Sequence, residues 1–348
     1  MNMLNALKQK NISVGYLYFY IHFVTEVVCF YFMSKIIGDS YILWILPLLY
    51  DVLAFVPQSL IGYICDKTKV NAGIIGVILL FISFLVFNLN IINQVFPLIF
   101  LCIGNCFLHI SGAEKTLKTS NGKLSHSAIF VAGGSFGVVT GKLLAKYGYS
   151  YILCLILIIT MIPFILLADT YKEETCDNFN YENKNISKIL VIILAVIVVI
   201  IRGYMGYGIP TTWNKTDVQL VMLYLFMGIG KALGGIVSDS IGFKKTIKIS
   251  TLLSIPFLIF GDNIMFISLI GVMLFSMTMA LTLALLVSVL KNTPGLAFGH
   301  TTIGLFLGTL PIFFIKIKNF NLTVIFIIAS SLICYLILNY ISKGDKNV

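Results

Sequence analysis

The stretch GGIVSDSIGFKK, Gly234–Lys245, interrupts a chain that is otherwise mostly apolar. It carries one aspartate, a glycine three residues later and two lysines. A shorter copy, GYICDKTK at Gly62–Lys69, stands much earlier in the chain. Asp66 and Asp239 are 173 positions apart, and each follows a glycine by four residues. A polar segment that recurs at a long offset between apolar runs predicts two matched halves.

The composition is that of a membrane protein. Of the 348 residues, 59% are hydrophobic and 11% are charged, whereas soluble domains carry roughly 25% charged residues. A bilayer needs about 20 apolar residues per helix, and the runs here are continuous rather than alternating, which predicts helices and not a barrel. Twelve spans are predicted: Val14–Ile36, Tyr41–Ile64, Ala72–Leu89, Val95–Ala113, Ser127–Ala145, Ser150–Leu167, Leu190–Ile209, Val218–Val237, Thr246–Phe260, Ile264–Leu290, Leu296–Ile315 and Leu322–Ile341.

The one long polar segment, Asp169–Lys188, separates six spans from six. We therefore predict an all-α membrane protein with two pseudo-symmetric six-helix bundles, residues 1–168 and 189–348, joined by a linker at 169–188. Glycines also recur in both halves, with Gly137 and Gly304 167 positions apart. This pattern is typical of the parallel repeats of secondary transporters.

Lysine placement predicts the orientation. With the N-terminus inside, sixteen lysines fall on the cytoplasmic side: Lys8, Lys10, Lys67, Lys69, Lys115, Lys118, Lys123, Lys172, Lys184, Lys188, Lys244, Lys245, Lys248, Lys291, Lys343 and Lys346. Five fall outside: Lys35, Lys146, Lys215, Lys316 and Lys318. This positive-inside bias predicts a multi-pass protein of the cell membrane with both termini cytoplasmic. It also accounts for the net charge of +10 without nucleic-acid binding.

The second-half motif, Gly235-x-x-x-Asp239-x-x-Gly242-x-Lys244-Lys245, resembles the loop signature of the major facilitator superfamily. The resemblance implies that the aspartate binds helix ends or basic residues in one of two conformations. The chemistry agrees, because a carboxylate is stabilised at a helix N-terminus and lysines at an anionic inner leaflet. We expect two conformational latches, with these members: Gly62, Asp66, Lys67, Gly235, Asp239, Gly242, Lys244 and Lys245. A purely topogenic loop is the alternative.

A narrower resemblance concerns the first half. His22-Phe-Val-Thr-Glu26 is similar to the His-Phe-x-x-Asp of fosmidomycin-resistance-type efflux proteins, as are Pro57–Gly62 and Phe107-Leu-His109. Here Glu26 replaces the aspartate, and His109 lacks the proline that usually follows. The resemblance implies export of a small organic or drug-like compound.

Ionisable groups inside spans cost about 2.5–3.5 kcal/mol each on insertion scales, so they are candidates for function. Glu26 lies about 12 residues, or roughly 18 Å, into the first span, and Asp51 is similarly deep in the second. His22 lies one turn from Glu26 on the same face. We predict Glu26 and Asp51 as proton sites with His22 as their modulator. A structural polar pair is the alternative.

Arg202 is the one arginine of the chain and lies deep in the seventh span. The guanidinium group is planar, permanently charged and presents paired N–H donors, which suits binding of a carboxylate or an anionic substrate. An arginine in a fixed ion pair is the alternative. Lys231, among the glycines of the eighth span, is a further candidate for the substrate site. So are four tyrosines, which could equally be packing residues: Tyr18, Tyr20, Tyr204 and Tyr207.

Other ionisable residues are left open. Lys142 is predicted to anchor at the outer interface, while His109 and His300 could form a gate or bond to a helix end. The seven cysteines are scattered and include no CxxC pair, so we predict neither metal ligands nor disulfides. No cofactor is expected, and the absence of a P-loop sequence argues against ATP as the driving force.

The stretch Gly133–Gly137 matches GxSxG, which raises the possibility of a serine protease. The glycines at 133, 137 and 141 instead form a stripe for close helix packing, so we predict no enzyme. The expected function is proton-coupled export of a small organic solute by a monomer. Uptake of an organic anion is the alternative, and a non-transporting receptor or scaffold is a remote one. Substrate, direction and stoichiometry stay open.

The topology can be tested by labelling. A cysteine introduced at Val348 should react with a membrane-impermeant maleimide only after the cells are permeabilised, because the lysine bias places the C-terminus inside. Labelling of this cysteine in intact cells would contradict the predicted orientation.

Overall fold

A computed structural model describes residues 13–38, 45–68, 70–88, 95–208, 213, 216–315 and 319–343. The described part is helical. Its α-helices are α2 (Val14–Gly38), α3 (Ile45–Phe55), α4 (Gln58–Lys67), α5 (Ala72–Asn88), α6 (Val95–Lys118), α7 (Ser125–Lys146), α8 (Tyr151–Ala168), α9 (Lys188–Gly208), α10 (Asp217–Ile241), α11 (Phe243–Thr251), α12 (Ser254–Phe260), α13 (Met265–Ser276), α14 (Thr278–Val289), α15 (Pro294–Thr309) and α16 (Phe320–Ile341).

These helices account for the twelve predicted spans. Ten segments are long and apolar enough to cross a bilayer, and α5 is a shorter apolar helix. The ninth span is the pair α11 and α12, and the tenth is α13 followed by α14. The fold class predicted from the sequence is therefore confirmed. The residues that would open the second span, 41–44, lie outside the described part.

The second span is broken at Pro57, between α3 and α4. A proline has no N–H and its ring displaces the preceding turn, so carbonyl groups lose their helical partners. Ala54 O accepts hydrogen bonds from Gln58 Nε2 at 2.7 Å and from Cys106 Sγ at 3.1 Å. Phe55 O accepts one from the Thr302 hydroxyl of α15 at 3.0 Å. Gln58 of the same span and side chains of two neighbouring helices thus satisfy these carbonyl groups, as a membrane interior requires.

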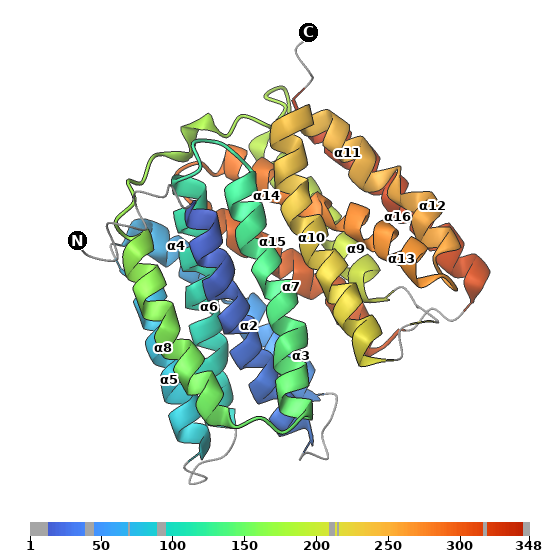
Figure 1. The fold of residues 1–348 in the computed structure, drawn as a ribbon. Coiled ribbons are helices and arrows are strands. Elements are labelled where there is room, and N and C mark those ends of the chain that lie inside the picture. The colour runs from blue at the N-terminus through green and yellow to red at the C-terminus, as the bar shows by residue number, and fades with distance from the viewer. Residues whose placement is uncertain are drawn as a thin grey trace.

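The helices form two groups that lie side by side in Figure 1, α2–α8 and α9–α16. Within the first group α2 packs on α7 and α8, and α5 packs on α6. Within the second group α9 packs on α14, α15 and α16, and α10 packs on α13. The groups meet where α7 contacts α10 and where α4 contacts α15. This arrangement is consistent with two bundles, and their boundaries at 169 and 188 stay a prediction.

Glycines let α7 lie against the backbone of α2. A Cβ atom at Gly133 would overlap Phe19 O, one at Gly137 would overlap Phe23 O, and one at Gly141 would overlap Val27 O. The stripe on α7 therefore works as a small-residue packing surface, which allows close helix approach in a membrane. This contact fixes α2, and with it the ionisable residues of the first span.

Asp66 and Asp239 join the two groups at one end of the molecule. Asp66, on α4, accepts hydrogen bonds at 2.9 Å from the backbone N–H groups of Gly295 and Leu296 at the start of α15. Asp239, on α10, accepts hydrogen bonds at 2.9 Å from the backbone N–H groups of Leu124 and Ser125 at the start of α7. Each carboxylate thus lies on the helix N-terminus of the opposite half, where charge and donors both favour it.

The other motif residues support these contacts unequally. A Cβ atom at Gly62 would overlap the backbone of Gly295, and one at Gly235 would overlap Leu124 O, so both glycines permit close approach of the halves. Gly242 ends α10 with φ +97°, a conformation that only glycine adopts without strain.

The three motif lysines differ in their surroundings. The Lys244 ammonium donates to Asn339 O at 2.6 Å. Lys67 is exposed and lies over the Tyr63 ring, 5.9 Å from its centroid. Lys245 is exposed.

The polar segment after α8 crosses the end of the molecule that carries these aspartates (Figure 1). Tyr181 donates from its hydroxyl to Gly122 O at 2.9 Å, and its backbone N–H donates to Ser288 Oγ at 3.0 Å. Burial alone would raise the pKa of Glu173, but hydrogen bonding and charge from Lys115 and Lys118 hold this pKa below its usual range. The segment is therefore attached to both halves.

Asp239→Asn tests the latch. Asparagine has nearly the same shape as aspartate but lacks the negative charge that accepts hydrogen bonds from two backbone N–H groups. The contact between the two halves at this end should therefore be destabilised by about 1–3 kcal/mol. Alkylation of a cysteine at the buried position Ser238, followed by mass spectrometry, should therefore become faster. Asp177→Asn, on the exposed part of the linker, should leave that rate unchanged. An alkylation rate in Asp239→Asn equal to that of the wild type would contradict a latch.

Candidate functional site

A cavity of about 150 Å³ lies between the two halves. Its wall from the first half includes the polar residues His22, Glu26, His109 and Ser135. Its wall from the second half includes Arg202, Tyr224, Lys231 and Thr302. Apolar side chains such as Phe30, Phe298 and Met279 fill the remaining wall. A mostly apolar cavity with a few convergent polar groups is the usual form of a small-molecule site.

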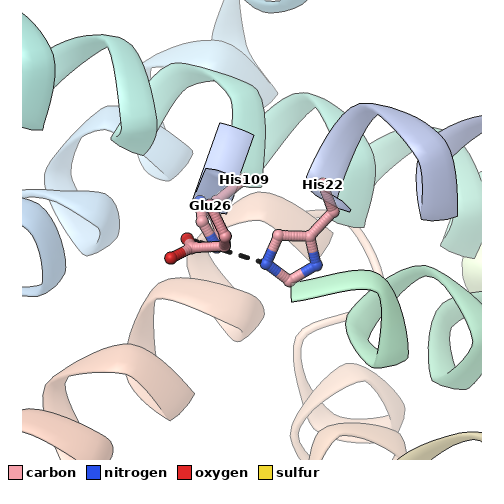
Figure 2. Close-up of side chains that lie close together, drawn as sticks. All are labelled: His22, Glu26 and His109. Carbon is pink, nitrogen blue, oxygen red and sulfur yellow. Dashed lines mark ion pairs between the residues drawn. The ribbon is translucent and has the colours of Figure 1, made fainter. Parts of the chain in front are cut away.

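Glu26 is the centre of the polar group in the first half. Its Oε1 atom lies 3.4 Å from His109 Nε2 and 3.9 Å from His22 Nε2, and all three side chains are buried (Figure 2). Asn105 Nδ2 donates to the same Oε1 at 3.1 Å. Asn105 also contacts the Tyr50 hydroxyl at 3.2 Å. A buried carboxylate thus lies beside two imidazoles that can share a proton with it, and it accepts a hydrogen bond from an amide.

Three helices hold this cluster in place. His22 and Glu26 come from α2, and His109 comes from α6. The His22 ring lies where a Cβ atom of Gly134 on α7 would be, so this glycine leaves room for the imidazole. The two imidazole rings meet edge to face with centroids 4.4 Å apart. One imidazole nitrogen from each histidine and one carboxylate oxygen of Glu26 all lie within 4.8 Å of one another.

The second half supplies the positive charges. Arg202 on α9 is buried, and its Nη1 atom donates to Met279 Sδ at 2.8 Å. Lys231 on α10 lines the same cavity and interacts electrostatically with Glu26 and Arg202. Acidic and basic groups therefore face one cavity from opposite halves, so their separation depends on how the halves are placed.

The predicted tyrosines lie elsewhere. Tyr18 is fully buried and shares a hydrogen bond of 2.7 Å with the Ser111 hydroxyl. Tyr20 bonds to the Thr160 hydroxyl at 2.6 Å, and Tyr204 packs edge-on against Phe326. None of these three lines the cavity described above, so the structure places them in helix packing. The side chain of the fourth, Tyr207, lies outside the described part of the chain.

Asp51 and Lys142 do not line the cavity. Asp51, on α3, is half-buried and interacts electrostatically with Lys142 of α7 and with Glu26. Lys142 donates to the Tyr224 hydroxyl at 3.2 Å and lies over the Phe30 ring, so it is packed between helices rather than anchored at the surface. His300 bonds through Nδ1 to Leu296 O at 2.8 Å, near the start of α15.

Sequence reasoning missed three residues of the site. The sequence does not decide the role of His109, and it does not single out Asn105 or Tyr224, which connects the cavity wall to Lys142. Asn105 and His109 are four residues apart on one apolar helix. This i, i+4 pair of polar groups on one face could have been noticed, but its proximity to Glu26 depends on the packing of α6 against α2.

No known sequence family and no curated protein matches the chain, whereas solved structures do. An alanine variant of the E. coli fucose:proton symporter FucP is 12% identical, with a TM-score of 0.62 over 95% of this chain and 98% of that one. FucP in the outward conformation, a major facilitator superfamily transporter, is 11% identical with a TM-score of 0.56 over 93% and 99%. A bacterial homologue of the iron transporter ferroportin, outward-facing, is 11% identical with a TM-score of 0.57 over 94% and 99%. The chain therefore has the fold of the major facilitator superfamily transporters.

Proposed function

We propose that the protein is a proton-coupled secondary transporter of a small organic solute in the cell membrane. The observation that carries this proposal is the buried carboxylate of Glu26 between two imidazoles, on the wall of a cavity that both halves form. Placing an ionisable group at this depth in a membrane costs free energy, so such groups have a partner or a function. The solute would occupy the cavity, and the proton would occupy the Glu26 cluster.

Coupling would follow from the charges on the two walls. When Arg202 and Lys231 are near, their positive charge favours ionised Glu26 and the proton leaves. When the halves move apart or an anionic solute engages the cations, burial favours protonated Glu26. Proton binding would thus be tied to the conformation and to the solute, which is what a gradient-driven cycle requires.

The latches suit such a cycle. Asp66 and Asp239 each bridge from one half to a helix N-terminus of the other, so both must be released before that end can open. The lysine bias assigns this end to the cytoplasm. In the described conformation we therefore infer that the cytoplasmic end is closed, and that opening exchanges these contacts for access to the cavity.

We favour export as the direction, because of the resemblance of His22–Glu26 to efflux proteins. Uptake of an organic anion is the second candidate. It is favoured by Arg202 and Lys231, two cationic groups on the cavity wall. Thermal stabilisation of the purified protein by a panel of metabolites and drugs would identify the solute.

Glu26→Gln should uncouple transport from the proton gradient. The amide has nearly the same shape but cannot take up a transported proton, so proteoliposomes should still exchange the identified solute while losing pH-driven accumulation. Glu174→Gln, an exposed linker residue, is the matched control and should accumulate solute normally. If Glu26→Gln still accumulates solute in response to pH, the proton site lies elsewhere and Asp51 becomes the candidate.

Arg202→Lys should reduce solute exchange by about tenfold or more, since an ammonium cannot present the paired donors of a guanidinium. Lys231→Arg adds donors without losing charge and should be better tolerated. Exchange of labelled solute under equal pH on both sides isolates binding and translocation from the gradient. Wild-type exchange in Arg202→Lys would show that a positive charge suffices at this position.

A further inference from the structure

The cluster of His22, Glu26 and His109 has a second chemical property besides proton binding. Both imidazoles bond through Nδ1 to a backbone carbonyl oxygen at 3.0 Å, His22 to Phe130 O and His109 to Asn105 O. A carbonyl oxygen only accepts hydrogen bonds, so each Nδ1 must carry the proton. In each neutral ring, Nε2 therefore carries no proton and presents a lone pair.

Three acceptors consequently meet at one buried point. One possible ligand atom from each of the three side chains lies within 4.8 Å of the other two, and Glu26 Oε1 is 3.9 Å from His22 Nε2 and 3.4 Å from His109 Nε2. Asn105 Nδ2 donates to Glu26 Oε1 at 3.1 Å, but neither imidazole Nε2 donates to it, so the lone pairs of the two rings and the carboxylate repel one another, and burial makes this repulsion costly. The arrangement is stabilised by a cation between them, and two imidazoles with one carboxylate are the ligand set of many transition-metal sites.

We propose that these three side chains bind one divalent first-row transition-metal ion. Ligand bonds of about 2.1 Å in a tetrahedral site place ligand atoms about 3.4 Å apart, and His109 Nε2 is 3.4 Å from Glu26 Oε1. Only a small inward shift of His22 is then needed. The carbonyl groups that fix both imidazoles, and the Asn105 amide on the carboxylate, provide the outer hydrogen bonds that such ligands use.

The ion would reach the site through the cavity, because all three side chains line it. In this respect the inference rests on the proposed function, which makes that cavity the transport route. The same carboxylate would hold either a proton or a metal ion, since metal ligands must be deprotonated.

The cavity contains charges that oppose a metal ion. The Lys231 ammonium interacts electrostatically with His22, Glu26 and His109, and Arg202 lines the same cavity. Both charges lower the affinity for a dication. Lys231→Gln should thus bind the metal ion more tightly than the wild type. A nonspecific site on the surface would not show this increase in affinity.

Binding can be measured on the purified full-length chain after removal of any histidine tag. Equilibrium dialysis with Zn²⁺ should give one ion per chain. His22→Gln, Glu26→Gln and His109→Gln should each weaken binding at least about tenfold. His300→Gln is the matched control, because His300 makes the same type of Nδ1 bond to the carbonyl four residues earlier, and it should bind normally. Absence of stoichiometric binding, or equal affinity in all variants, would overturn the proposal.

Co²⁺ absorption on the wild type provides evidence that does not depend on the folding of variants. Nitrogen and oxygen ligands should give ligand-field bands without the thiolate charge-transfer bands expected if Cys29 or Cys106 bound the ion. Strong thiolate bands would also overturn the proposal. Failure of metal binding with intact pH-driven transport rejects the metal site alone, whereas metal binding without pH-driven transport rejects the proton coupling alone.

Discussion

The central constraint on this molecule is the cost of placing a carboxylate inside a membrane. Glu26 lies in a membrane-spanning helix and is buried, so its charge must be removed by a proton or balanced by a cation. The imidazoles of His22 and His109 and the amide of Asn105 surround it from the first half. The second half brings its cations to the same cavity. The acidic and basic groups therefore face the same cavity from opposite halves.

The rest of the fold keeps this cluster in position and joins the two halves. The glycine stripe of α7 fixes α2, which carries Glu26, by direct contact between backbones. The halves are joined differently, by carboxylates on helix N-termini. The halves also touch through close helix packing at Gly62 and Gly235, so a change of conformation must separate these surfaces as well as break the carboxylate hydrogen bonds. Rigid halves with breakable contacts between them are the requirement for two discrete conformations.

The sequence was sufficient for the fold because its signals are local. Apolar length predicts spans, and the duplicated motif predicts where the two aspartates lie. The site was only partly predictable. Depth favoured Glu26, which lines the cavity, and equally Asp51, which does not line it.

The tyrosines show the same limit. Tyr18 lies one turn from His22, yet it bonds to Ser111 inside the first half. Helical spacing fixes neighbours on one helix, but the contact of His109 with Glu26 depends on which faces of two helices meet. That information is not local.

The most direct test is whether protonation of Glu26 sets the conformation. Spin labels at Lys123→Cys and Ser240→Cys, two exposed positions beside the Asp239 latch, would report the distance between the halves by double electron–electron resonance, with the native cysteines replaced. If protonation of Glu26 sets the conformation, the distance distributions should differ between acidic and alkaline pH in the wild type, and Glu26→Gln should give one pH-independent distribution that matches the wild type at acidic pH. An identical pH response in Glu26→Gln would contradict it.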